Sequence, residues 1–117
     1  MATQLGTLSI DKVEGKEIHG SFESVYEKNV YSPYNGFGAA VLMEIWDKFD
    51  QDSHHPFAPE LNEAADSYSP DILEKFIQKV SFATPNKAKT KFVITVADER
   101  IATIAEAGMD WDSYYLG

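Results

Sequence analysis

The sequence predicts an α+β fold: a small antiparallel or mixed β-sheet with about four helices packed on it, forming a single pair of layers. Apolar residues alternate with polar ones near the N-terminus, and a β-rich run follows residue 91. Between and after these segments, apolar residues recur at helical spacing. The order strand, strand, helix, helix, helix, strand, helix differs from the regular alternation of parallel α/β folds. Because no repeat or flexible linker divides the chain, we expect one globular domain over residues 1–117.

The first two strands form a predicted β-hairpin. Residues 5–13 and 18–22 have the two-residue period of half-buried strands, and Gly15 lies between them at a turn. The expected apolar face consists of Leu8, Ile10, Ile18 and Phe22.

An amphipathic helix is predicted over residues 39–49, after a structured loop at 29–38. The loop contains turn formers and aromatic residues. On the helix, Glu44, Asp47 and Lys48 occupy the expected solvated face.

Two further helices are predicted after a loop at 50–57. Pro59 can open the first of them, with its packed side formed by Leu61, Ala64, Ala65 and Tyr68. The second has Ser69 as N-cap and Pro70 at its first position. Its apolar positions are Ile72, Leu73, Phe76, Ile77 and Val80.

The C-terminal third contains a strand, a helix and an aromatic tail. The run 92–97 is apolar on both faces, which is typical of a strand near the middle of a sheet. Asp98 can cap a helix that Gly108 would end in the left-handed conformation. We expect the tail, 109–117, to dock on the body or on a partner. The alternating Lys87, Lys89 and Lys91 are interpreted as protection of an edge strand or as an aid to solubility.

The net charge favours a basic protein partner. The chain has 19 acidic and 10 basic residues, a formal charge of −9, which opposes direct binding to nucleic acid or to anionic membranes. Eight acids and one base lie in 31–72, whereas five lysines and two acids lie in 73–98. We therefore expect an electrostatically two-sided molecule.

The composition also bears on location and on sulfur chemistry. No apolar run approaches the roughly 18 residues of a membrane span, and residues 1–6 lack the features of a secretory signal, so a cytoplasmic location is expected. The absence of cysteine excludes disulfides and thiolate ligands.

No catalytic residue and no cofactor is predicted. The chain lacks a nucleophile elbow, a P-loop and a dinucleotide fingerprint, and the glycines of Gly36-Phe37-Gly38 are interpreted as packing or loop residues. A weak candidate metal site consists of Asp50, Asp52, His54 and His55. Its spacing fits neither an EF-hand nor a zincin, so a solvated polar loop is the favoured interpretation.

Aromatic residues beside carboxylates predict a binding surface, because tyrosine and tryptophan anchor interfaces and carboxylates steer basic partners. Aromatic rings occur in the first loop, at Tyr26, Tyr31, Tyr34 and Phe37, and in the tail. The candidate binding residues are Tyr34, Glu44, Asp47, Asp50, Asp52, Asp110, Trp111, Asp112, Tyr114 and Tyr115.

The leading functional hypothesis is an immunity-type inhibitor that occludes a basic surface, such as the active site of a nuclease toxin. A phage-type antagonist that mimics nucleic acid is the first alternative, because carboxylates can be spaced like phosphates. A small metal-assisted hydrolase using the Asp50 to His55 cluster is the second. An oligomeric structural protein is the third.

Overall fold

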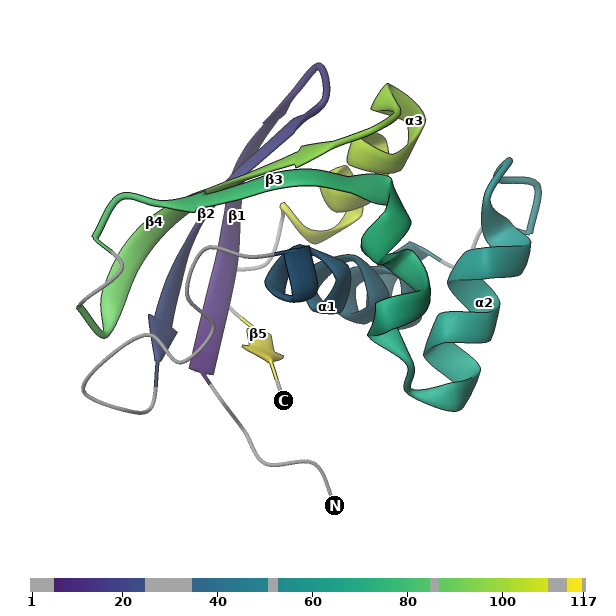
Figure 1. The fold of residues 1–117 in the computed structure, drawn as a ribbon, viewed down its shortest axis with the longest axis horizontal. Coiled ribbons are helices and arrows are strands. Elements are labelled where there is room, and N and C mark those ends of the chain that lie inside the picture. Colours follow the sequence, from purple (N-terminus) through teal and green to yellow (C-terminus); the bar gives the residue numbers. More distant parts are fainter. Residues whose placement is uncertain (1–5, 25–34, 51–52, 85–86, 110–113, 117) are drawn as a thin grey trace.

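A five-stranded antiparallel sheet in the order β3-β4-β2-β1-β5 forms one layer of the protein (Figure 1). The computed structural model describes residues 6–24, 35–50, 53–84, 87–109 and 114–116. The strands are β1 (Gly6–Glu14), β2 (Glu17–Ser24), β3 (Ile77–Phe82), β4 (Lys89–Val96) and the short β5 (Tyr114–Leu116).

The helices pack against this sheet as a second layer. They are α1 (Asn35–Ile45), its π-helical continuation η1 (Trp46–Asp50), α2 (Ala58–Ser67), the 3₁₀ helix η2 (Pro70–Phe76), α3 (Glu99–Ala102) and the 3₁₀ helix η3 (Thr103–Gly108). The predicted α+β class with helices on a small sheet is thus confirmed. None of the helices in the described part of the chain is long and apolar enough to cross a membrane.

The predicted hairpin is present as β1 and β2. The strands turn at Gly15, whose φ is 59°, and Glu14 pairs with Glu17. Leu8, Ile10, Ile18 and Phe22 are all buried, as expected from the two-residue period.

Helix α1 is the centre of the core, which differs from the predicted amphipathic helix. It begins at Asn35, so Gly36, Phe37 and Gly38 are helical and the expected loop ends earlier than predicted. Residues 37–43 are all buried because α1 lies between the sheet and the outer helices (Figure 1). A methyl group added at Gly38 would lie 3.1 Å from side chains of β3 and β4. Gly38 therefore lets the helix approach the sheet closely, which agrees with the packing interpretation of this glycine.

Phe37 joins the two layers. Its ring contacts Phe22, Phe82 and Phe92 edge-on, at centroid distances of 5.3, 4.9 and 5.1 Å. Such edge-to-face contacts are favourable geometries for aromatic rings. The expectation that this ring contributes to a surface loop is wrong.

The predicted helix from Pro70 through Val80 is half strand. Residues Pro70–Phe76 form the 3₁₀ helix η2, and the chain then enters the edge strand β3. The register shifts between Ile77 and Lys79, so a bulge at this point lets both Ile77 and Val80 face the core. The three-residue spacing that resembled a helix arises from this bulge. Ser69 precedes η2, but its side chain does not cap the helix.

Helix α2 confirms its predicted packed positions except one. Leu61 and Ala64 are buried, whereas Tyr68 follows the helix and is 74% exposed. The indole N–H of Trp46 donates to Asn62 Oδ1 at 2.8 Å and so links η1 to α2.

Strand β4 lies inside the sheet, between β3 and β2, as expected for the run at 92–97. The interpretation of Lys89 and Lys91 as edge protection is therefore wrong, because the edge strand is β3. Both lysines are exposed on β4.

The last helix and the tail also follow the predicted order. Asp98 caps α3 by accepting the N–H of Arg100 at 2.9 Å. The helix ends at Gly108, but this glycine does not take a positive φ; the chain closes with a 3₁₀ turn in which Met109 donates to Glu106. β5 pairs with β1 through Leu8 and Tyr114, so this part of the tail docks on the body.

Candidate functional site

The two layers carry opposite charge balances. The strand segments 6–24, 77–82 and 87–97 contain six lysines and four acids. The helical segments 35–50, 53–76 and 98–109 contain eleven acids and three bases. The two-sided charge expected from the sequence therefore maps onto the two layers of the fold.

The strongest candidate is a surface on α2 and η2, here called the α2–η2 surface and defined by Glu63, Asp66, Tyr68, Asp71 and Glu74. All five residues are exposed. Within the described segments, no basic group forms an ion pair with any of these four carboxylates. In Figure 1, α2 lies at the end of the molecule farthest from the β3–β4 turn, with η2 beside it. The surface is therefore net negative, with the exposed Lys75 as the base that also lies on η2.

Tyr68 stands at the junction of the two helices in a left-handed backbone conformation, with φ 52° and ψ 45°. Its N–H and that of Ser69 bond to carbonyls in the last turn of α2, which closes the helix. Sequence reasoning placed Tyr68 on the packed side of the helix. Pro70 is the signal that indicated an end to α2 near Tyr68, because the helical conformation is disfavoured for the residue before a proline and helices usually end at or before that residue.

The structure describes five of the ten predicted binding residues. Glu44 is half-buried and pairs with Lys48 at 3.0 Å, and Asp47 is exposed on η1. Asp50 ends η1, and Tyr114 and Tyr115 contribute backbone to β5. The remaining predicted residues, Tyr34, Asp52, Asp110, Trp111 and Asp112, lie outside the described residues.

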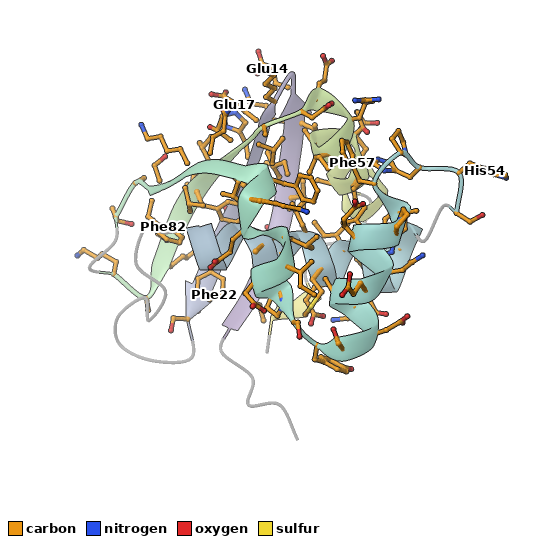
Figure 2. All side chains as sticks on the ribbon, turned by 45° about the vertical axis from the view of Figure 1, so that its right-hand side comes forward. Glu14, Glu17, Phe22, His54, Phe57 and Phe82 are labelled. Carbon is orange, nitrogen blue, oxygen red and sulfur yellow. The ribbon has the colours of Figure 1, made fainter. Side chains whose placement is uncertain are left out.

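His55, of the weak metal candidate, is held by two hydrogen bonds. The N–H of Phe57 donates to Nδ1 at 3.1 Å, so Nε2 carries the proton and donates to the carbonyl oxygen of Arg100 at 2.9 Å. His55 could ligate a metal only after losing one of these bonds. His54 points away from the body, as Figure 2 shows. Asp52 lies outside the described residues, and the side chains that are described include no group of three metal-ligating residues.

Arg100 and Asp98 form an ion pair in the helical layer, and the pair shifts the pKa of both groups. Side-chain hydrogen bonds from the Arg100 guanidinium, followed by the bond from its backbone N–H, lower the pKa of Asp98 to about 2. The guanidinium also lies over the Phe57 ring, 5.4 Å from its centroid. Because Asp98 caps α3, the Asp98–Arg100 pair has a local structural role.

The face of the sheet that no described helix covers, here called the uncovered face, contains a hollow of about 460 Å³. A second register shift, between Ile10 and Lys12, brings Asp11 and Lys12 together at its rim. The other side chains that line it on this face are His19, Ser81, Lys91 and Val93. A smaller hollow of about 270 Å³ is lined by Ser9, Ser21, Glu23 and Lys89 among others.

The charges around the larger hollow are compensated. Lys91 lies 3.7 Å from Asp11, Lys12 lies 3.1 Å from Glu14, and His19 lies 3.1 Å from Glu17. Figure 2 shows Glu14 and Glu17 together at the turn of the β1–β2 hairpin. Each of these nitrogen-bearing side chains thus has an acidic neighbour, whereas the four carboxylates of the α2–η2 surface have no basic partner among the described residues. Sequence reasoning missed this hollow because alternation alone does not reveal a bulge.

Comparisons with protein-family models, curated proteins and solved structures give no match for this chain.

Proposed function

We propose that the protein is a small acidic binding protein of the immunity type, which occludes a basic surface of a protein partner such as a nuclease toxin. The observation that supports this most is the α2–η2 surface, where four exposed carboxylates lack ion-pair partners among the described residues. Uncompensated carboxylates accelerate encounter with a basic partner and disfavour acidic ones. The cytoplasmic location expected from the sequence belongs to this proposal.

Of the binding residues predicted from the sequence, Asp47 is included in the proposed contact surface. It is exposed on η1, and the indole of Trp46 beside it is bonded to Asn62 of α2. This bond fixes the start of η1 relative to α2. The proposal therefore keeps Asp47 and adds the carboxylates of α2 and η2, which the sequence-based set did not include.

The experiment is a calorimetric titration against a panel of basic nucleases, with inhibition of nuclease activity as the second readout. The test variant reverses Glu63, Asp66, Asp71 and Glu74 to lysine. The control variant reverses Asp11, Glu14, Glu17 and Glu23, which changes the net charge equally but on the strand segments. Loss of affinity of at least about tenfold in the first variant alone supports the proposal.

Equal loss in both variants would reduce the effect to net charge and contradict a defined contact surface. Unchanged affinity in the helical variant would remove the basis of the proposal. Nucleic-acid mimicry differs in a further measurement, because a mimic competes with DNA for the same site on the partner.

A further inference from the structure

We infer that Tyr68 is the anchor residue of the α2–η2 surface and that its ring receives an arginine or lysine side chain of the basic partner. This inference rests on the proposed function for the sign of the partner's charge. It adds the residue that contributes most to the contact and the kind of group that meets it.

Tyr68 is largely exposed to solvent. Tyr68 is 74% exposed, whereas the aromatic rings of Phe22, Phe37 and Phe92 are at most 2% exposed. A ring this exposed buries little apolar area in the free protein, so packing within the chain does not account for it. Tyrosine is among the residues that most often dominate binding energy at interfaces.

The backbone of Tyr68 has an unusual left-handed conformation. Among the described residues, Tyr68 is the sole non-glycine residue with positive φ. The left-handed conformation is unfavourable for a residue with a Cβ, and glycine or asparagine commonly occupies the position that closes a helix. A tyrosine at this position lowers the stability of the free chain, and exposed strain of this kind is found at functional sites.

The surrounding charge selects the partner group. Asp66 and Asp71 lie two residues before and three residues after Tyr68, and both are exposed. A cation that approaches the ring face is attracted by the ring and by both carboxylates. An acidic or purely apolar group would have to desolvate these carboxylates without compensation. The geometry thus favours a guanidinium or an ammonium group.

The first test uses the protein alone. Tyr68→Gly relieves the backbone strain and is expected to raise Tm by about 3 °C. Tyr68→Ala keeps the strain and removes the ring, and should leave Tm within about 2 °C of the wild type. Leu61→Ala, in the fully buried interior of the same helix, serves as the control and should lower Tm by more than about 8 °C. A loss in Tyr68→Ala comparable to that of Leu61→Ala would make the ring structural and overturn the inference.

The second test measures binding to a hexa-arginine peptide by NMR chemical-shift titration at low salt. The wild type should bind with the largest shifts at residues 63–74, and Tyr68→Ala should weaken binding at least about fivefold. Binding by Tyr68→Ala equal to the wild type, or no binding by the wild type, would overturn the anchor role. If the four-carboxylate variant binds like the wild type while Tyr68→Ala does not, the anchor stands and the proposed acidic function fails.

Discussion

The sheet layer and the helical layer differ in how their charges are arranged. On the uncovered face of the sheet, Lys12, His19 and Lys91 each lie within 4 Å of a carboxylate. On α2 and η2, by contrast, no basic group in the described part of the chain forms an ion pair with an exposed carboxylate. The side chains around the larger hollow are therefore paired within the molecule, whereas four exposed carboxylates of the outer helices are not paired with a described base.

Under the proposed function, the two layers therefore have different roles: the sheet stabilises the fold, and the outer helices contact the partner. The sheet contributes the paired strands and three of the four rings that meet at Phe37, and three ion pairs lie on its surface. The outer helices need only bury one side, with Leu61, Ala64 and Leu73 fully enclosed. The other side of these helices can therefore carry several carboxylates. These carboxylates repel one another, which lowers stability slightly, but they increase the attraction for a basic partner.

The largest predicted effect tests the junction of the two layers. Phe37→Ala removes the ring that contacts Phe22, Phe82 and Phe92 across the interface between α1 and the sheet. We expect a loss of about 4 kcal/mol in the free energy of unfolding, measured by urea denaturation. Phe37→Leu, which keeps most of the volume, should cost less than half as much. A loss below about 1 kcal/mol in Phe37→Ala would show that the layers do not depend on this contact.

A smaller effect tests the sheet layer alone. At Gly20, an added methyl group would clash with the carbonyl oxygen of Ser9 and would lie 2.6 Å from the Phe92 ring. Because the first of these atoms belongs to the backbone of β1, the hairpin must open for the substitution to fit. We expect Gly20→Ala to lower the free energy of unfolding by about 2 kcal/mol, measured by urea denaturation.

The control for this experiment is Ser21→Ala, at the next position of β2 on the uncovered face. It should change stability by less than about 0.5 kcal/mol. Equal stability of Gly20→Ala and the wild type would contradict the close approach of β1 and β2 at this point.

Three of the five strands, β1, β2 and β4, were predictable from the sequence, the first two because their residues interact with near neighbours. The hairpin needs only the alternation of Leu8, Ile10, Ile18 and Phe22 and the turn at Gly15, all within 15 residues. The apolar run 92–97 likewise indicated a central strand, and β4 does lie between β3 and β2.

The edge strand β3 and the helical layer were less predictable because tertiary contacts decide their structure. Ile77 and Val80 have helical spacing, and only pairing with β4 and the bulge before Lys79 make them strand residues. The burial of α1 on all sides depends on η2 and α2 lying outside it, which its own sequence does not show. The glycines at 36 and 38 indicated a loop, whereas close packing on the sheet requires Gly38 in the helix.

The candidate site followed the same division. The excess of acids in 31–72 was visible in the sequence and correctly located negative charge on the helical segments. Tyr68 was not identified, because the spacing from Leu61 and Ala64 assigned it to the packed side. Its exposure follows from where α2 ends, and that end depends on the backbone of Ser69 and Pro70.

The smallest predicted effect concerns Asp98, a carboxylate of the helical layer whose pKa is strongly lowered. Hydrogen bonds from Arg100 lower the pKa of Asp98 from 3.8 to about 2 in the folded protein. A group whose pKa is lowered by folding stabilises the fold above its unfolded pKa, and this contribution is lost as the pH falls through the folded pKa. Asp98→Asn, which also weakens the cap of α3, should therefore lower Tm by a few degrees at pH 6. The difference from the wild type should shrink between about pH 4 and pH 2 in calorimetric scans. Glu99→Gln removes the neighbouring exposed charge and serves as the control. A gap between Asp98→Asn and the wild type that stays constant from pH 6 to pH 2 would show that the Asp98–Arg100 pair does not stabilise the fold through its charge.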